Sequence, residues 1–409
     1  MPAVGDLAGL ELHCAHARFV FNLGLEQRSL WRPGLKAPGV NEQTRQLAQA
    51  RAVFPWLAAG SSAVQQQALR DLDRAYSNFF AGRARYPRFH RRGADDGFAV
   101  RDIRLRRLSA RLGEVLIPKV GWVRFKVHRT WDRYTSATSA RVTLRNGLWH
   151  IAFTTPPPQK INAGTGAVVG IDRGVANALA TSDGQMIHLP GLTPGEQTRY
   201  LALQRRLARQ TRAAKKTGRP LREASNRART LAALAKLRAR LDNRRTDAVE
   251  QATTALARTY DLIVMEALNT RGMVKRPTPK PDPANPGAFL PNHARAKAAL
   301  NRLIHASRWG QIHRRLTDKM PDGHLVTVNP AYTSRICHVC GHQEANNRES
   351  QAVFACQSCG HTAHADTNAA RNILARALHH QPGDTGGSGA SVSTRSRTNQ
   401  PSTGKRVAA

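Results

Sequence analysis

Four cysteines in two matched pairs constrain this chain more than any other feature. They stand as Cys337-x-x-Cys340 and Cys356-x-x-Cys359, with fifteen residues between the pairs. Each Cys-x-x-Cys turn directs two thiolates at one point, and two such turns complete the tetrahedral shell of a structural zinc site. A disulfide or redox pair is the alternative. We predict one zinc ion held by all four, and we expect the remaining cysteine, Cys14, to be a small buried apolar residue.

Four histidines beside the cysteines offer alternative ligands. They are His338, His342, His361 and His364. Because four cysteines already fill a tetrahedral shell, we expect the histidines to bond outside it or to contact nucleic acid.

The charge of the chain indicates a polyanionic partner. The 409 residues include 63 Lys+Arg and 27 Asp+Glu, a formal net charge of +36. Such a surplus repels itself unless a polyanion neutralises it, and the arginines that dominate the basic runs suit the geometry of phosphate. We therefore predict a protein that binds nucleic acid.

Basic residues are densest between Arg199 and Arg245, where sixteen Lys+Arg and two acids leave a local charge of +14. Leucines at 231, 234, 237 and 241 give this stretch the apolar stripe of a helix. A solvated helix face is the alternative, but so many like charges would destabilise a helix without phosphate beside it. We predict nucleic-acid contacts from Arg205, Arg206, Arg209, Arg212, Lys215, Lys216 and Arg219.

Hydrophobic periodicity divides the first half of the chain. Residues 11–92 carry apolar residues at three- and four-residue spacing, which predicts helices with Leu69, Leu72, Tyr76 and Phe79 on one buried face. From about 98 to 157 the period changes to two. Segment 141–155 alternates around Asn146-Gly147, which predicts a β-hairpin, and consecutive prolines then indicate a linker.

The second half alternates buried strands with helices. VVGIDRGVANALATSDG (168–184) predicts three short strands joined by turns, and YDLIVMEALN (260–269) and LVTV (325–328) predict further strands.

No run of eighteen apolar residues occurs and the first thirty residues lack a signal-peptide pattern, so we expect an intracellular protein without a membrane partner. Residues 381–409, rich in Gly, Ser and Thr, are expected to be a disordered tail.

Three carboxylates stand beside the ends of these elements. Asp172 and Glu266 each end an apolar run, and Asp366 lies at the start of the expected helix TNAARNIL. A carboxylate at the end of a buried strand is costly unless it binds a cation or meets donors, so all three are candidate metal ligands. Each also has an ordinary explanation: Asp172 as a turn residue, Glu266 as a partner of Arg271, and Asp366 as an N-cap.

The order of these acids matches the layout of RNase H-like nucleases, in which carboxylates bind two Mg²⁺ ions that activate water and stabilise the leaving oxygen. Several segments resemble the RuvC-type nuclease segments and zinc ribbon of TnpB (OrfB) proteins, which insertion sequences encode. They are VVGIDRGV, LIVMEALN, NPAYTSRICHVCGH, CQSCGH and HADTNAARNIL. With HARFVFNLGLEQR and RAKAALNRLI, the resemblance extends from about residue 11 to 380.

The resemblance implies an RNA-guided DNA endonuclease related to type V CRISPR effectors. It implies Asp172, Glu266 and Asp366 as catalytic Mg²⁺ ligands, a guide RNA derived from the transposon end, and a double-stranded DNA target selected by base pairing beside a short motif that the protein reads. Such a protein is expected in the bacterial or archaeal cytoplasm at the nucleoid, as a monomer with its RNA.

The implied fold class is α/β multidomain. An RNase H-like (RuvC) nuclease domain with an inserted zinc ribbon accompanies an N-terminal helical recognition lobe and a small β wedge domain. The expected boundaries are 1–10 (start of the wedge), 11–92 (recognition), 93–160 (wedge), 161–336 (nuclease, including the basic stretch 199–245), 337–362 (zinc ribbon), 363–380 (final nuclease helix) and 381–409 (tail).

The chain departs from the family pattern in two ways. The basic strand that usually precedes the first family helix is missing, so the first strand of the wedge is in doubt. Ala267 stands where the family often has Asp, and Ala365 where Arg often precedes the last catalytic Asp. Both departures bear on activity, although neither removes an expected ligand.

Three other functions are the alternatives to this one. A nuclease-poor RNA-guided repressor would have lost an acid, whereas all three are present. A strand-transfer transposase would order its acids Asp, Asp, Glu or use a His-hydrophobic-His pair with a tyrosine, and neither pattern occurs. A compact type V CRISPR effector has a similar build, and its genomic neighbours would distinguish it.

Overall fold

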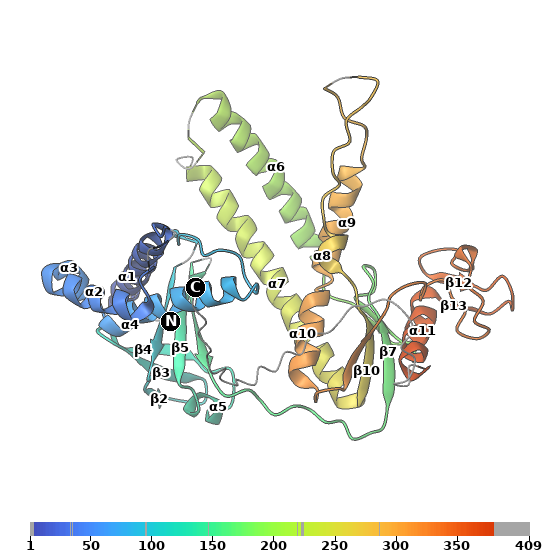
Figure 1. Ribbon diagram of the computed structural model, residues 1–409, viewed down its shortest axis with the longest axis horizontal. Coiled ribbons are helices and arrows are strands. Elements are labelled where there is room, and N and C mark those ends of the chain that lie inside the picture. The colour runs from blue at the N-terminus through green and yellow to red at the C-terminus, as the bar shows by residue number, and fades with distance from the viewer. Residues whose placement is uncertain are drawn as a thin grey trace, which may run out of the picture. The chain divides into compact units, whose positions relative to one another are not determined.

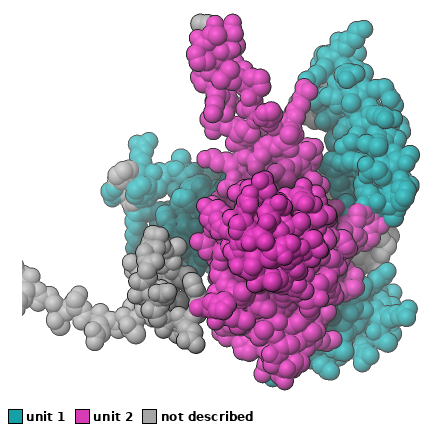
Figure 2. Space-filling view, turned by 90° about the vertical axis from the view of Figure 1, so that its right-hand side faces the viewer, with its two compact units in different colours: residues 1–159, 192–242 teal, residues 160–191, 243–409 magenta. Residues whose placement is uncertain are grey.

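The computed structural model describes residues 4–32, 34, 36–94, 96–145, 147–218, 220–221, 225–285 and 287–379. The chain forms two compact units, which we call unit 1 (residues 1–159 and 192–242) and unit 2 (residues 160–191 and 243–409) (Figures 1 and 2). The architecture is mixed α/β, as expected. Arg219, Asn146 and the expected tail 381–409 lie outside the described residues.

Unit 1 begins with four helices that bury one apolar face. They are α1 (Val4–Ser29), α2 (Val40–Val53), α3 (Pro55–Ala59) and α4 (Ser62–Phe80). Helix α4 starts at an N-cap, where the Ser61 hydroxyl accepts a hydrogen bond from the Val64 backbone N–H. Leu69, Leu72 and Tyr76 are buried on its inner face, as the periodicity predicted, whereas Phe79, near the end of the helix, is only half-buried.

Helix α1 extends further toward the N-terminus than the sequence suggested. Residues 4–10 form its first turns rather than a separate segment, because Leu10 is buried in the same apolar cluster as Leu25. Cys14 on this helix is 3% exposed, which confirms the expected apolar role. Burial raises the pKa of its thiol to about 12.

The strands of unit 1 form two antiparallel sheets. One joins β1 (Gly97–Arg101), β5 (Ser139–Arg145) and β6 (Leu148–Thr154), and the other joins β2 (Leu105–Arg107), β3 (Leu112–Ile117) and β4 (Gly121–Lys126). The expected hairpin is present, with Val142 opposite Ile151, and the short helix α5 (Asp132–Thr135) precedes it. Phe98 and Val115 share one apolar cluster with Leu72, so the helices and strands of unit 1 have a common core.

The basic stretch forms two long helices, α6 (Pro194–Lys216) and α7 (Ser225–Thr259). A capping box starts α6, because Thr193 and Glu196 each accept a hydrogen bond from the other's backbone N–H. The helices contact each other where Arg227 Nε donates to the Thr211 hydroxyl at 3.3 Å. Residues 192–242 group with unit 1, and the boundary between the units falls inside α7.

Unit 2 is built on a sheet with the strand order β11-β10-β7-β8-β9. The strands are β7 (Val168–Asp172), β8 (Leu179–Thr181), β9 (Met186–Ile187), β10 (Leu262–Glu266) and β11 (Leu325–Val328). Strand β10 is parallel to both β7 and β11, whereas β7, β8 and β9 are antiparallel neighbours. The expected strands are therefore all present.

Helices cover both faces of this sheet, which explains why its central strands β7 and β10 are apolar up to the acid that ends each of them. Ile171 and Met265 pack with residues of α7 and α10 (Trp309–Lys319) on one face. Val264 and Val328 pack with Ile373 of α11 (Ala365–His379) on the other. The remaining helices of unit 2 are α8 (Thr270–Met273) and α9 (Ala294–Ala306).

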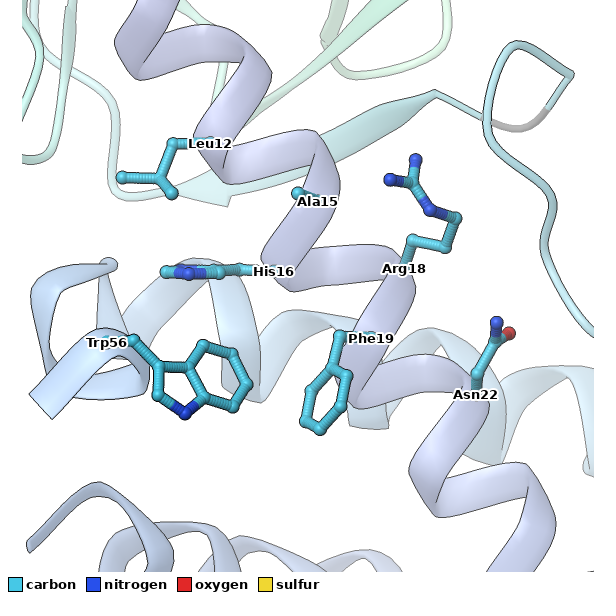
Figure 3. Close-up of a pocket in the computed structure, with 7 residues that line it drawn as sticks. All are labelled: Leu12, Ala15, His16, Arg18, Phe19, Asn22 and Trp56. Carbon is cyan, nitrogen blue, oxygen red and sulfur yellow. The ribbon is translucent and has the colours of Figure 1, made fainter. Parts of the chain in front are cut away.

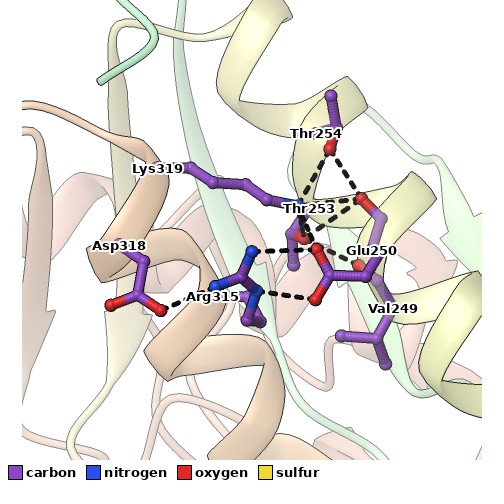
Figure 4. A network of polar contacts seen from close by, with 7 residues as sticks. All are labelled: Val249, Glu250, Thr253, Thr254, Arg315, Asp318 and Lys319. Atoms are coloured by element: carbon purple, nitrogen blue, oxygen red, sulfur yellow. Dashed lines mark hydrogen bonds and ion pairs between the residues drawn. The ribbon is translucent and has the colours of Figure 1, made fainter. Parts of the chain in front are cut away.

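A charged network fastens α7 to α10 beside this core (Figure 4). Glu250 accepts from the guanidinium of Arg315 at 3.0 Å and pairs with the Lys319 ammonium at 3.0 Å. Lys319 Nζ also donates to the hydroxyls of Thr253 and Thr254 at 2.7 and 2.8 Å. Every charge in the network is thus paired, as a partly buried cluster requires.

Among the described helices, none has the length and apolarity needed to cross a bilayer.

Candidate active site and metal centre

The four predicted zinc ligands come together in unit 2. The Sγ atoms of Cys337, Cys340, Cys356 and Cys359 all lie within 4.8 Å of one another. Two of the S···S distances are 3.7 Å (Cys337 to Cys359) and 3.6 Å (Cys340 to Cys356). A tetrahedron with Zn–S bonds of about 2.3 Å has edges of about 3.8 Å, so the set fits one zinc ion.

Backbone hydrogen bonds and a glycine shape each of the two Cys-x-x-Cys turns that hold the ligand sulfurs. The N–H of Gly341 donates to the Cys337 carbonyl, and that of Gly360 donates to the Cys356 carbonyl. Both glycines have positive φ, +76° and +69°, a conformation that only glycine adopts without strain. The antiparallel pair β12 (Val353–Ala355) and β13 (Thr362–His364) closes the ribbon.

Of the four neighbouring histidines, none belongs to this sulfur cluster. His338 Nδ1 bonds to Asn368 Oδ1 at 3.0 Å, and its Nε2 accepts from Arg371 at 3.0 Å. Because arginine can only donate, the proton of a neutral His338 lies on Nδ1. His342 pairs with Glu344 at 3.2 Å. These two histidines therefore bond outside the ligand shell, as expected.

Helix α11 ties the ribbon to the sheet. Two of its asparagines, Asn368 and Asn372, donate to the Ile336 carbonyl at 2.8 and 2.6 Å, just before the first cysteine. Asn372 also donates to the Thr333 carbonyl at 2.9 Å. The same helix carries Asp366 in its first turn. The position of the ribbon and the position of Asp366 are thus fixed by one helix.

The three predicted carboxylates lie at the C-terminal ends of strands β7 and β10. Asp172 ends β7 and Glu266 ends β10, and these parallel strands are adjacent, with Ile171 opposite Met265. Helix α11 crosses β7 at Gly170, where a Cβ atom would lie 2.1 Å from the Ala370 carbonyl oxygen. Only glycine permits this approach. One turn before Ala370, Asp366 is therefore brought beside the end of β7.

Burial and neighbouring charges shift the pKa values of two of the three acids. Burial, and then repulsion by Glu266 and Asp366, raises the pKa of Asp172 to about 7. Burial also raises the pKa of Glu266, although a hydrogen bond from Thr333 opposes this shift. Glu266 and Asp366 are 7% and 6% exposed. A buried group of carboxylates that repel one another is a site that a divalent cation stabilises.

Protein donors form hydrogen bonds to two of the carboxylates. Asp366 Oδ1 accepts from Arg348 at 3.2 Å and its Oδ2 from Asn177 at 3.1 Å. Glu266 Oε1 accepts from the Thr333 hydroxyl at 2.5 Å. Within the described residues, only the cysteines form a group of three or more possible ligand atoms within 4.8 Å. The acids thus interact without being as tightly gathered as the sulfurs.

The ordinary explanations of these acids do not match their surroundings. Asp172 is the last residue of a strand, and Asp366 lies inside the first turn of α11 rather than at its N-cap. The side chain of Glu266 bonds to Thr333, and no bond to Arg271 is found among the described residues. Arg173, which is buried, donates to the Glu266 backbone carbonyl instead.

Comparison with known proteins identifies the family. Residues 150–277 match the OrfB_IS605 family model, described as "Probable transposase", and residues 309–373 match the model described as "Cas12f1-like, TNB domain". A candidate RNA-guided DNA endonuclease, InsQ of Escherichia coli (strain K12), is 33% identical over 326 residues, which are 78% of this chain and 75% of InsQ. The chain belongs to the TnpB (OrfB) family.

A second relative and a solved structure extend the match. A candidate RNA-guided DNA endonuclease of Streptomyces pristinaespiralis is 26% identical over 374 residues, covering 88% of this chain and 83% of that protein. The fold resembles that of Cas12f1 in a complex with single guide RNA and target DNA, with a TM-score of 0.53 and 12% identity, covering 91% of this chain and 82% of the other. The family predicted from sequence motifs is confirmed.

Three residues around the acids of this TnpB-family chain escaped the sequence analysis. Thr333, Asn177 and Arg348 are polar residues of common type, and their roles depend on contacts with acids that are distant in the chain. Only Thr333 carried a signal, because it lies within the NPAYTSRICHVCGH segment that resembles the family.

The predicted basic contacts of the TnpB-family chain lie on α6. Six of the seven named residues are described, and all six are exposed: Arg205, Arg206, Arg209, Arg212, Lys215 and Lys216. None of the six side chains has a hydrogen bond or ion pair to another residue in the described part of the chain. These cations are therefore available to an external polyanion.

Proposed function

We propose that this TnpB-family protein is an RNA-guided DNA endonuclease that cuts its target with two Mg²⁺ ions held by Asp172, Glu266 and Asp366. The observation that carries this proposal is the convergence of three acids from β7, β10 and α11 at one sheet edge, where burial and mutual repulsion raise the pKa of Asp172 to about 7. Unit 2 would then be the RNase H-like (RuvC) nuclease domain, with the ribbon and α11 as its C-terminal part.

The residues of the site have distinct tasks in this mechanism. Bound Mg²⁺ would activate water and stabilise the leaving oxygen of the phosphodiester. The three carboxylates would hold the ions. Thr333 keeps one oxygen of Glu266 fixed, and Asn177 does the same for Asp366. Arg348 places a cation beside Asp366, where it offsets carboxylate repulsion and offers a contact for the scissile phosphate.

Unit 1 would supply recognition. Its helices in 11–92 correspond to the expected recognition lobe and its strands in 93–160 to the wedge, while α6 and α7 would follow the guide RNA or the guide-target duplex. The relatives named as RNA-guided DNA endonucleases and the net charge of +36 support a guide RNA and a DNA target. By the family resemblance, the guide would derive from the transposon end and the target would be double-stranded DNA in the bacterial cytoplasm. One structural zinc would occupy the cysteine cluster.

The proposed function is tested on the protein purified with its RNA. Sequencing the copurified RNA identifies the guide, and a plasmid that carries the matching sequence is then incubated with the complex. We expect cleavage that requires both the guide and Mg²⁺. If the complex binds the plasmid but leaves it intact in Mg²⁺ and in Mn²⁺, the protein is an RNA-guided binding protein and not a nuclease.

Thr333 is expected to position Glu266 for metal binding. Thr333 is 2% exposed, and its hydroxyl donates a hydrogen bond to Glu266 Oε1. The substitution Thr333→Val therefore removes the donor with little change in the shape of the side chain. We expect the Mg²⁺ concentration for half-maximal cleavage to rise by about 10- to 100-fold, as for other partners of metal ligands. Thr333→Ser should restore it. Thr327→Val, at an exposed position on β11, is the control. Equal Mg²⁺ dependence in all three variants would refute the role.

The exposed arginines of α6 are expected to bind phosphate. Replacing Arg205, Arg206, Arg209 and Arg212 with glutamine should weaken nucleic-acid binding and flatten its salt dependence. The log-log slope should fall by up to about 0.9 per lost duplex contact, or about 0.7 per single-strand contact. Lysine at the same four positions keeps the charge and should keep the slope. If the glutamine variant keeps the wild-type affinity for nucleic acid and the wild-type salt slope, these arginines do not contact phosphate and only face solvent.

A further inference from the structure

Unit 1 contains a pocket that the proposed function does not use. It is a cavity of about 460 Å³ between α1 and α3, lined by aromatic and aliphatic side chains together with Arg18 and Asn22. Figure 3 shows Leu12, His16 and Phe19 on one side of α1 and the indole of Trp56 facing them from α3. Its lining thus combines flat apolar rings with few polar groups, as small-molecule and base-binding sites do.

The aromatic rings of the pocket are left open to solvent. Phe19 is 42% exposed and Trp56 is 48% exposed. Complete burial of either ring would stabilise the fold, because each has a large apolar surface. Their planes are inclined at 85° with centroids 4.9 Å apart, an edge-to-face contact. In that geometry the edge of one ring meets one face of the other, and the opposite faces are not covered by this pair. A planar ligand could therefore stack on one of the two rings.

His16 adds a directed hydrogen-bond donor. It is 4% exposed, and its Nδ1 lies 3.2 Å from the Gln65 amide nitrogen, which donates its other hydrogen to the Leu57 carbonyl. Since Nδ1 accepts, the proton of the neutral ring is on Nε2. Burial, and then the neighbouring His13 and cations, lower the pKa of His16 and keep the ring neutral. No described residue accepts a hydrogen bond from this N–H.

The surroundings of the pocket are positively charged. Arg51 and Lys119 both act on His16, and Lys119 Nζ reaches the Ala58 carbonyl at the end of α3 at 2.8 Å. Arg18, at the rim, is paired with Asp96. A ligand here has to be flat, to accept a hydrogen bond at its edge, and to belong to a molecule that tolerates nearby cations. An unpaired nucleobase on a phosphate chain meets all three conditions.

We propose that the pocket of Phe19, Trp56 and His16 holds one unpaired base of the guide RNA, stacked on the Trp56 ring and hydrogen-bonded to His16 Nε2–H. This inference rests on the proposed function for the presence of a guide RNA. RNA is the favoured source because folded RNA offers unstacked bases in loops, and proteins recognise these by aromatic stacking and edge contacts. Target DNA, in contrast, is paired with itself or with the guide until it opens.

The test compares three variants of the full chain, each assembled with the guide RNA in the absence of DNA. Trp56→Ala removes the stacking ring, Trp56→Phe keeps a ring, and Trp31→Ala removes an exposed tryptophan that does not line the pocket. We expect Trp56→Ala to weaken RNA binding by about 5- to 150-fold, the loss that corresponds to one stacked base. Trp56→Phe should retain most of the affinity, and Trp31→Ala all of it.

Chemical probing of the RNA gives the second readout. One unpaired base should be protected in the wild-type complex and become reactive in the Trp56→Ala complex at saturating protein. Unchanged affinity together with unchanged reactivity would overturn the inference, and so would a defect that appears only after target DNA is added, which would assign the pocket to DNA. If the wild type itself binds no RNA, the proposed function fails instead. Circular dichroism of Trp56→Ala is used to check that the helices remain folded.

Discussion

Replacing Asp366 with asparagine is expected to reduce target cleavage by more than about 100-fold, while guide RNA and target DNA remain bound. Mutation of a residue that hydrogen-bonds to a metal ligand typically lowers metal affinity or activity by about 10- to 100-fold. Loss of the charge of a ligand itself should therefore lower activity by more than that range. The substitution keeps the shape of the side chain and its place in the first turn of α11. Binding should be preserved, because the exposed cations of α6 that we propose to contact phosphate lie elsewhere in the chain. Cleavage rates and target affinities of the two proteins are compared at saturating Mg²⁺.

Asp172→Ala and Glu266→Ala are expected to give the same loss, since all three acids belong to one site. Asp318→Asn is the matched control, because Asp318 is a half-exposed acid of the same unit that pairs with Arg315. It should cut at the wild-type rate. Near wild-type cleavage by any one of the three site variants would show that its carboxylate is not a metal ligand.

Removing the zinc is expected to unfold the ribbon. The wild type should contain one zinc ion per chain, and Cys337→Ser should lose it. Structural zinc sites contribute about 10 to 16 kcal/mol of folding free energy in small zinc domains, far more than the contacts of a short β pair. Limited proteolysis and hydrogen exchange should locate the opened segment at residues 337–364. Because Asn368 and Asn372 of α11 bond to residues beside the ribbon, cleavage should fall together with the fold.

Cys14→Ala provides the control for this experiment, since Cys14 is buried on α1 and remote in sequence from the cluster. That variant should retain the full zinc content, even if it is slightly less stable. A wild-type protein that contains no zinc after purification without chelators would contradict the assignment of the cysteines.

Features of local origin could be predicted from the sequence. The pairing of Val142 with Ile151 follows from alternation around a turn, and the sulfur cluster follows from two Cys-x-x-Cys turns. The strands that end at Asp172 and Glu266 were visible as apolar runs. In each case a short segment contains all the information that its structure needs.

Features that depend on distant contacts could not be predicted. Thr333 reaches Glu266 across 67 residues and Asn177 reaches Asp366 across 189 residues, and no local pattern records either bond. The pocket escaped notice because Phe19 and Trp56 lie on different helices, where each resembles an ordinary core residue. Helix α1 begins earlier than predicted because burial of Leu10 depends on the rest of unit 1.

The close crossing at Gly170 affects how related sequences should be compared across genomes. A Cβ atom at this position would collide with the Ala370 carbonyl oxygen, so any larger residue must push α11 away from the strand that it covers. A relative that has lost this glycine can keep every acid and every cysteine in its sequence while its last acid is displaced from the other two. Surveys that separate active nucleases from their inactive descendants should therefore examine this backbone position as well as the acids themselves.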